Sequence, residues 1–200
     1  MYRIFKRILD VLISLIILGL FGWMIFLLII ISTVDTRAFG LYQQIRIGYH
    51  GKEFSIFKIR TMRRLIGYNS FTTTSHDPRI TKLGMVFRRY KIDELPQVLN
   101  VLLGQMSFVG PRPTVREDFL KMDAIQKQRN TVRPGITGLA QINGNTYLSW
   151  PERIKFDIIY VDELSFSQDL SIVWNTVRLI LKNKVHTDPK DSDEWLDINS

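Results

Sequence analysis

Residues 11–34 read VLISLIILGLFGWMIFLLIIISTV, an apolar run without a charged side chain. A helix that rises ~1.5 Å per residue over such a run can cross a hydrocarbon core of ~30 Å. Buried helices of soluble proteins are generally shorter and carry a polar stripe. A signal peptide would have a shorter apolar core and a small-residue cleavage site, and neither is found here. We therefore predict an N-terminal membrane-inserted helix over residues 1–36.

The basic residues around this helix leave its orientation open. Arg3, Lys6 and Arg7 precede the apolar run, and Arg37 and Arg46 follow it. An excess of cations at one end would direct that end to the cytoplasm, whereas cations at both ends are expected if both ends face the cytoplasm. A re-entrant helix that bends near its central glycines and a helix that crosses the bilayer are both compatible with the sequence.

The remaining composition is that of one folded domain that meets anionic partners. Two hundred residues suffice for one core plus an anchor. The formal net charge of +8 favours nucleic acid, anionic lipids or phosphorylated substrates without choosing among them. The absence of cysteine excludes disulfides, thiolate metal sites and a cysteine nucleophile. The histidines are far apart and lack ligand spacing, so we predict none as a metal ligand.

The pattern after the anchor predicts an α+β fold that is mainly helical. Residues 41–60 alternate with period two around a turn at residues 49–52, which is typical of a β-hairpin. Apolar residues at three- and four-residue spacing predict a helix from Asp93 towards Leu103, with Pro96 in its first turn and Gly104 as its stop.

Weaker patterns complete the expected organisation. We expect a loop that leads into a short helix at residues 78–90, helices at 114–130, 151–161 and 169–184, and loops at 72–77, 110–113 and 133–145. The last helix has a broad apolar side, which fits either a membrane surface or packing on the core. The acidic residues 188–200 are expected to form a mobile tail.

Asp93 and Glu94 stand at the start of the predicted helix and allow two interpretations. An aspartate before Glu-Leu-Pro is a good N-cap that complements the helix dipole. The same helix start also attracts phosphate, and two adjacent carboxylates can hold Mg²⁺ together with substrate phosphates. An ionised aspartate can moreover attack phosphorus and form an acyl phosphate.

Arginines in ordered segments supply the cations that a diphosphate would need. Arg88 precedes the carboxylates, Arg112 lies between two prolines, and Arg133 precedes Pro134. A guanidinium on a rigid Pro-Arg-Pro loop is preorganised for bidentate binding of phosphate. Together these arginines predict an anion site.

These motifs resemble the bacterial sugar transferase family, whose members are monotopic polyprenol-phosphate phosphoglycosyl transferases. The central match consists of residues 77–81, Arg88, residues 93–97, residues 100–102 and residues 106–113. Further matches are Lys6, Arg7, Asp10, Gln44, Arg46, Gly48, residues 58–62, residues 132–138, Ala140, Gln141, Asp157, Tyr160 and Val161. The resemblance therefore covers most of the chain.

The resemblance implies transfer of a sugar 1-phosphate from a UDP-sugar to polyprenyl (undecaprenyl) phosphate, with release of UMP, as the first membrane step of bacterial glycan assembly. It implies that Asp93 is the nucleophile of a covalent aspartyl phospho-sugar intermediate and that Glu94 is its essential partner, with Mg²⁺ as the cofactor at both carboxylates. Arg88 and Arg112 are implied at the phosphate site, with Asp157 close to it and Lys58 as a further phosphate contact. Arg133 is our additional candidate for donor binding.

The resemblance also implies where the protein works. In the family the N-terminal segment is a re-entrant helix, so we expect residues 37–187 to form a small membrane-associated catalytic domain with interfacial amphipathic helices. That domain would lie on the cytoplasmic face of the bacterial inner membrane, in contact with membrane lipids. A membrane-tethered nucleic-acid module would explain the charge and the anchor, but the sequence has no helix-turn-helix, RNP or zinc pattern. We therefore expect no nucleic-acid partner.

Two positions depart from the family pattern. Gly22-Trp23 stands where members usually have Ser-Pro, and without proline the helix keeps the hydrogen bond whose loss favours a sharp bend. Asn145 stands where an arginine commonly contacts the nucleotide-sugar phosphates, and Arg133 is a candidate replacement. The short form resembles members that use N-acetylated amino or deoxyamino sugars. The particular sugar, the glycan and the oligomeric state are not determined by the sequence.

Overall fold

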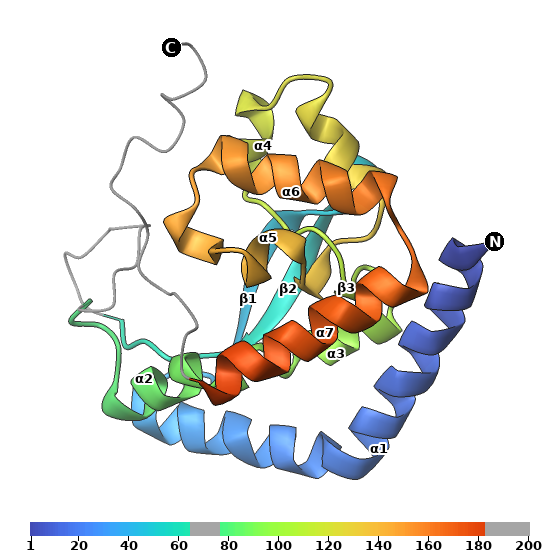
Figure 1. Ribbon diagram of the computed structural model, residues 1–200. Coiled ribbons are helices and arrows are strands. Elements are labelled where there is room, and N and C mark those ends of the chain that lie inside the picture. Colours follow the sequence, from blue (N-terminus) through green and yellow to red (C-terminus); the bar gives the residue numbers. More distant parts are fainter. Residues whose placement is uncertain (65–76, 183–200) are drawn as a thin grey trace.

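The structure, a computed structural model, describes residues 1–64 and 77–182 and is a mainly helical α+β fold (Figure 1). Its helices and strands are α1 Tyr2–Thr36, β1 Leu41–Ile47, β2 Glu53–Ile59, α2 Lys82–Arg89, α3 Gln97–Leu102, β3 Ser107–Val109, α4 Arg116–Lys121, β4 Gly135–Thr137, α5 Leu139–Ile142, α6 Trp150–Asp162 and α7 Phe166–Leu181. Short 3₁₀ helices occur at Tyr49–Gly51, Ile92–Glu94, Gln126–Thr131 and Asn145–Tyr147. The expected tail at 188–200 and nearly all of the expected loop at 72–77 lie outside the described residues.

Helix α1 bends sharply near its middle, so that its two halves run in different directions (Figure 1). The indole Nε1 of Trp23 donates a hydrogen bond to the backbone carbonyl of Leu20 at 3.0 Å. A side chain that bonds to a carbonyl of the preceding turn competes with the helical hydrogen bonds, which is one cause of a kink. The bend thus forms without the proline found in the family pattern, and Trp23 contributes a polar contact there.

Both halves of α1 are attached to the same domain. In the N-terminal half, the Asp10 carboxylate accepts a hydrogen bond from the Phe108 backbone N–H at 3.2 Å. In the C-terminal half, the Ser32 hydroxyl donates to the Arg60 carbonyl at 2.5 Å. Asp10 and Ser32 are both buried by these contacts. Both halves of the helix are therefore held against the same domain.

The middle of α1 projects away from the domain and is apolar. Large exposed side chains occupy it: Leu20, Phe21, Trp23 and Phe26. Within the described residues, α1 is the one helix that is long and apolar enough to cross a membrane. The predicted N-terminal apolar helix is confirmed in extent, since α1 ends at Thr36.

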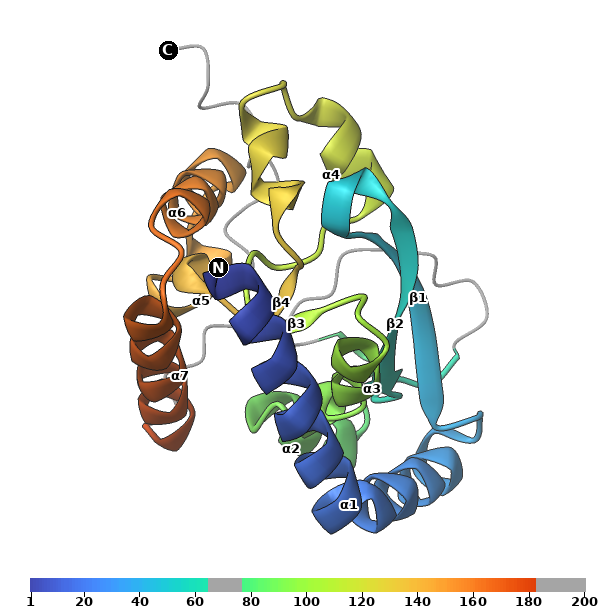
Figure 2. The same ribbon diagram turned by 90° about the vertical axis from the view of Figure 1, so that its right-hand side faces the viewer.

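The predicted β-hairpin is confirmed and packs on α3. Strands β1 and β2 pair in antiparallel register from Leu41 opposite Ile59 to Ile47 opposite Glu53. The buried Asn100 side chain joins α3 to β2, because its Oδ1 accepts from the Phe57 N–H at 3.0 Å. Figure 2 shows α3 between the hairpin and the N-terminal half of α1. Because the hairpin is bound to α3, these elements together fix the position of the residues that precede α3.

A short parallel strand pair corrects the expected loop at residues 133–145. Strand β3 pairs with β4, with Ser107 opposite Gly135 and Val109 opposite Thr137. Gly135 permits the close approach, since a Cβ there would lie 2.1 Å from the Gly110 nitrogen. Glycine and proline in this segment therefore serve backbone packing, and α5 follows directly.

Two expected helices are shorter than predicted. The helix expected from Asp93 begins only at Gln97, because residues 92–94 form a separate 3₁₀ turn before Pro96. The helix expected over 114–130 is split into α4 and a 3₁₀ helix. The split follows from local side-chain bonds, since Asp123 Oδ1 accepts from the Gln126 N–H at 2.8 Å and competes with helical pairing.

The short helix expected within residues 78–90 follows a loop, as predicted, and is α2. The helices expected at 151–161 and 169–184 are present as α6 and α7 with small shifts. Helix α7 starts earlier, at Phe166, because the Ser165 hydroxyl caps it by accepting from the Gln168 N–H at 3.3 Å. Its inner side joins a core of Val109, Val132, Tyr160 and Ile172.

Candidate active site

Asp93 and Glu94 lie in the 3₁₀ turn before α3 and are both buried. Lys91 initiates this turn in the left-handed conformation, with φ at 58°. Asp93 does not cap a helix, so the capping interpretation is wrong. Among the described residues, its buried Oδ1 has no hydrogen-bond partner. A buried carboxylate oxygen without a partner is costly, and such groups are retained where they act on a ligand.

Glu94 is bound by two cations from different parts of the chain. Arg112 Nη2 lies 2.7 Å and Lys58 Nζ 3.2 Å from Glu94 Oε1. Lys58 comes from β2, and Arg112 comes from the loop after β3. Glu94 therefore holds two cationic side chains beside Asp93.

The two neighbouring carboxylates have opposite electrostatic surroundings. Burial and the adjacent Glu94 charge raise the pKa of Asp93. Burial alone would raise the pKa of Glu94 as well, but Arg112 and Lys58 lower that pKa well below its usual value. A pair whose pKa values are pushed apart is typical of groups with different chemical roles. The Asp93 carboxylate is therefore the more basic of the two, whereas the surroundings of Glu94 favour its ionised form.

A buried ion pair holds the backbone of Arg112. Arg129 donates from Nη2 to the Arg112 carbonyl at 2.7 Å. The same guanidinium donates from Nε to Asp157 Oδ2 at 2.8 Å, and both side chains are buried. Asp157 therefore acts on the site through Arg129, because it positions the loop that carries Arg112 without reaching the carboxylates itself.

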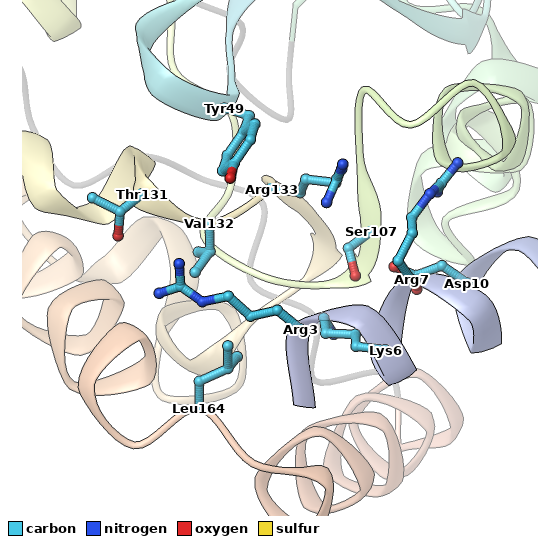
Figure 3. A pocket seen from close by; sticks show the side chains of 10 residues that line it. All are labelled: Arg3, Lys6, Arg7, Asp10, Tyr49, Ser107, Thr131, Val132, Arg133 and Leu164. Carbon is cyan, nitrogen blue, oxygen red and sulfur yellow. The ribbon is translucent and has the colours of Figure 1, made fainter. Parts of the chain in front are cut away.

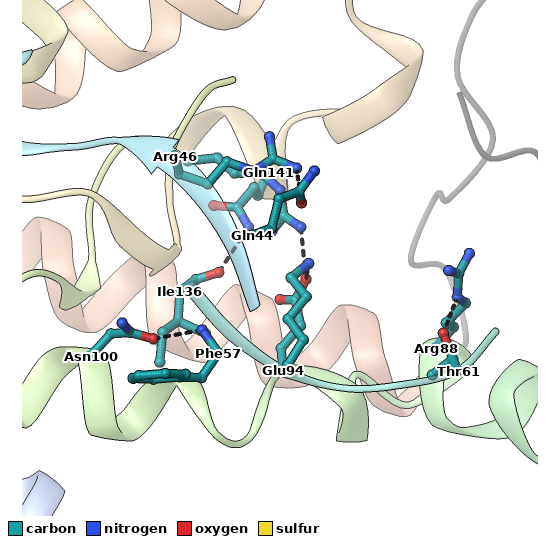
Figure 4. Close-up of polar contacts among 11 residues, drawn as sticks. Gln44, Arg46, Phe57, Thr61, Arg88, Glu94, Asn100, Ile136 and Gln141 are labelled. Atoms are coloured by element: carbon teal, nitrogen blue, oxygen red, sulfur yellow. Dashed lines mark hydrogen bonds and ion pairs between the residues drawn. The ribbon is translucent and has the colours of Figure 1, made fainter. Parts of the chain in front are cut away.

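Arg88 lies in the last turn of α2, and Figure 4 shows its side chain beside Thr61. Its Nε donates to the Thr61 hydroxyl at 2.8 Å. Burial lowers the pKa of Arg88, whereas the Asp93 charge raises it. Arg88, Lys58 and Arg112 thus bring three cations towards one pair of carboxylates.

The hairpin and α5 add three polar residues that our site prediction left out. Gln44, Arg46 and Gln141 lie together near Glu94 (Figure 4). Arg46 Nη2 donates to Gln44 Oε1 at 2.7 Å, and burial lowers the pKa of Arg46 to about 10. Gln141 donates to the Ile136 carbonyl at 2.9 Å, while its buried Oε1 has no partner within the described residues. The sequence could have indicated two of them, because Gln44 and Arg46 are two residues apart and therefore lie on the same face of a strand.

Arg133, a sequence-predicted position, lies apart from this cluster. Arg133 donates from Nε to the Gly104 carbonyl at 2.9 Å, beyond the C-terminal end of α3. Asp93 and Glu94 precede the N-terminal end of the same helix. Asn145 begins the 3₁₀ helix after α5 at a positive φ of 51°, a conformation that asparagine tolerates.

The residues fit a hydrated Mg²⁺ shared with a diphosphate. Asp93 keeps one buried oxygen without a partner, and both cations on Glu94 bind its Oε1. Mg²⁺ binds through one or two carboxylates, with water and phosphate oxygens as its other ligands. The described residues contain no group of three acidic, His or Cys side chains that would hold a metal alone. Asp93 and Glu94 would hold the ion, which would neutralise phosphate charge.

A buried pair of carboxylates among several cations is an arrangement that can bind phosphate groups. The chain belongs to the bacterial sugar transferase family, whose model matches residues 1–183. Its N-terminal apolar helix agrees with a membrane protein.

Several curated proteins share this similarity. The uncharacterized sugar transferase EpsL of Bacillus subtilis is 38% identical over 89% of this chain and 88% of its own length. The exopolysaccharide production protein ExoY of Sinorhizobium fredii is 37% identical over 86% of this chain and 83% of its own. The UDP-glucose:undecaprenyl-phosphate glucose-1-phosphate transferase of Escherichia coli is 36% identical over 88% of this chain but 40% of its own. This chain thus spans most of the shorter relatives and less than half of the longer one.

Proposed function

We propose that this protein transfers a sugar 1-phosphate from a UDP-sugar to polyprenyl phosphate and releases UMP. The observation that carries the proposal is the unpartnered Asp93 carboxylate oxygen beside the Arg112–Glu94–Lys58 ion pairs. Three nearby cations suit a diphosphate, and a desolvated carboxylate suits attack on phosphorus. The name of the Escherichia coli relative, which specifies UDP-glucose and undecaprenyl phosphate, supports the substrate classes.

In the proposed first step, an Asp93 oxygen attacks the β-phosphorus of the UDP-sugar. The bond from this phosphorus to the bridging oxygen breaks, and that oxygen leaves on UMP. Arg112, Lys58 and Arg88 neutralise the phosphate charge while Asp93 retains the sugar phosphate as an acyl phosphate. In the second step an oxygen of polyprenyl phosphate attacks the same phosphorus and frees Asp93. Two easier displacements thereby replace one transfer between two dianionic substrates.

The test is an assay for UMP with the full chain in detergent micelles. Purified protein is incubated with polyprenyl phosphate and, in turn, UDP-glucose, UDP-galactose and the UDP-N-acetylated amino and deoxyamino sugars. Release of UMP with formation of a polyprenyl diphospho-sugar supports the function and identifies the donor. If none of these donors yields UMP in the presence of Mg²⁺ and acceptor, the proposed reaction is wrong.

Replacing Arg112 by lysine should lower kcat/KM by roughly 10- to 100-fold, because an ammonium keeps the charge but loses the forked pair of donors. Removing divalent cations with EDTA should stop turnover, and added Mg²⁺ should restore it. Steady-state UMP release measures both effects. The matched control is Arg116→Lys, since Arg116 pairs with Glu53 on the exposed surface. If Arg112→Lys has the same kcat/KM as the control, Arg112 does not act as a bidentate phosphate ligand.

We further propose that α1 is re-entrant and that the domain sits on the cytoplasmic face of the inner membrane. Attachment of both helix halves to one domain supports this topology, since a straight spanning helix would separate them. A row of exposed apolar side chains on α7 supports its contact with the same membrane surface: Phe166, Leu170, Val173, Trp174, Val177 and Leu181.

Cysteines placed before and after α1 should both be protected in intact cells. Arg3→Cys and Lys52→Cys are suitable because both side chains are exposed and the chain has no other cysteine. A membrane-impermeant thiol reagent should label neither position until the cells are permeabilised. Labelling of Arg3→Cys from outside, with Lys52→Cys protected, would show a spanning helix and overturn the re-entrant topology.

A further inference from the structure

A second basic site lies at the other end of α3 from the carboxylates. Its lining comes from the N-terminal turns of α1, from β3, and from the segment at residues 131–133 (Figure 3). Four of the lining residues are cations: Arg3, Lys6, Arg7 and Arg133. None of the residues at this pocket belongs to the Asp93–Glu94 cluster. The two sites are therefore separate, with α3 between them.

Three of these cations form no close ion pair within the described residues. Lys6 is paired with Asp169, whereas Arg3, Arg7 and Arg133 form no ion pair with a carboxylate there. The Arg7 guanidinium instead donates to the Val101 and Leu102 carbonyls at 2.6 and 2.9 Å. Three guanidinium groups around one pocket, opposed by the single lining carboxylate of Asp10, leave it strongly positive.

Neutral contacts hold two of the guanidinium groups in place. Arg133 donates to the Gly104 carbonyl at 2.9 Å, and its guanidinium lies 5.1 Å from the centre of the Tyr49 ring. Arg7 is held by the end of α3, as described above. Arg3 is exposed and reaches towards Val132 across the pocket (Figure 3). Two guanidinium groups, those of Arg7 and Arg133, are thus held in place, and the exposed Arg3 side chain can move to meet a ligand. Such an arrangement is suited to a phosphate group.

The surroundings of the pocket are apolar, which identifies the kind of phosphate. On α1, Ile4, Phe5 and Ile8 are exposed beside the basic residues. On α7, Phe166 is exposed and its ring lies 6.2 Å from that of Phe5. A free phosphate would gain nothing from these surfaces, whereas acyl chains would cover them. Cations next to an exposed apolar helix also match the headgroup level of a bilayer.

From these observations we propose that the pocket binds the phosphodiester headgroup of an anionic glycerophospholipid, with its acyl chains along α1 and α7. The proposal rests on the membrane location proposed above but uses no residue of the transfer reaction. The lipid would join the N-terminal half of α1, α7 and the end of α3. It would thereby hold the domain at a fixed depth in the membrane.

Native mass spectrometry of the delipidated full chain in detergent tests this site. The probes are phosphatidylglycerol and phosphatidylcholine with matched acyl chains, without donor or acceptor. Wild type should retain one phosphatidylglycerol in preference to phosphatidylcholine. The Arg3→Gln/Arg133→Gln variant should bind phosphatidylglycerol about tenfold more weakly, because charge-assisted hydrogen bonds are lost. Arg3→Gln alone removes no hydrogen bond or ion pair within the described residues, so it should weaken binding without affecting folding.

Lys155→Gln is the matched control, because it removes an exposed cation on α6 that does not line the pocket. Equal retention by the double variant, or equal loss in Lys155→Gln, would overturn the pocket assignment. Displacement of phosphatidylglycerol by an equal concentration of inorganic phosphate would assign the site to a free phosphate. The proposal of a lipid ligand would then be wrong. If wild type retains phosphatidylglycerol but releases no UMP in the assay, the proposed transferase reaction is contradicted and the lipid site is not.

Discussion

Asp93→Asn should reduce sugar-phosphate transfer by roughly 10³-fold or more, because an amide cannot attack phosphorus as a carboxylate can. The same change should leave the folded state as stable as wild type, or more stable, at neutral pH. Asp93 is buried and its Oδ1 is unpartnered among the described residues, so ionisation there is unfavourable. Loss of activity without loss of stability is the expected result.

The pH dependence of this variant has a definite sign. Because burial and Glu94 raise the pKa of Asp93, the folded chain binds that proton more tightly than the unfolded chain. The contribution of Asp93 to stability is therefore fully present below its unfolded pKa and is lost as the pH rises through the folded pKa. The stability difference between Asp93→Asn and wild type should be largest at neutral pH and should shrink on acidification.

Thermal unfolding in detergent, followed by circular dichroism, and UMP release measure the two effects. The control is Glu117→Gln, since Glu117 is an exposed acid on α4. This control should match wild type in both measurements. If Asp93→Asn turns over at the wild-type rate, the assignment of Asp93 as the nucleophile is wrong, whatever the stability of the variant.

Glu94→Gln should lower both activity and stability, which distinguishes it from Asp93→Asn. Lys58 and Arg112 would lose the buried anion that both now contact. Removing one partner of a buried ion pair costs ~3–5 kcal/mol, and we expect about 2–3 kcal/mol because Arg112 is 39% exposed. Since Glu94 also fixes Arg112 beside Asp93, kcat should fall by roughly 100-fold or more.

The pH dependence of Glu94→Gln runs in the opposite direction. Although burial opposes the shift, Arg112 and Lys58 lower the pKa of Glu94. Its stabilisation is present above the unfolded pKa and is lost as the pH falls through the folded value. Urea unfolding at neutral and acidic pH should therefore show that the difference in the free energy of unfolding between wild type and Glu94→Gln becomes smaller on acidification. Equal stability of Glu94→Gln and wild type at neutral pH would show that the two cations do not depend on Glu94.

Local patterns predicted most of the fold. The uncharged run at residues 11–34 predicted α1, and the period-two alternation predicted the β1–β2 hairpin. The parallel pairing of β3 with β4 was missed, because each strand has only three residues and no alternation can be recognised over so short a length. The glycines of the second segment suggested a ligand loop, although Gly135 is required by backbone packing.

The candidate site was predicted in outline and lacked its long-range geometry. The structure brings together the predicted Asp93, Glu94, Lys58 and Arg112. It places Arg133 at the opposite end of α3, which linear spacing could not indicate. The buried Arg129 was missed because a single arginine in a polar segment carries no sign of a partner 28 positions away. Trp23 was expected only to replace a proline, yet its indole bonds at the bend.

The central claim is that Asp93 carries the sugar phosphate covalently, and the donor alone tests it most directly. Full-length protein is mixed with the UDP-sugar identified by the assay, with Mg²⁺ and without polyprenyl phosphate. Intact-mass analysis and UMP measurement follow a single rapid quench. We expect a mass increase of one sugar phosphate and release of one UMP per active site, both absent in Asp93→Asn. Release of UMP only after polyprenyl phosphate is added, with no mass increase at any time, would contradict the account.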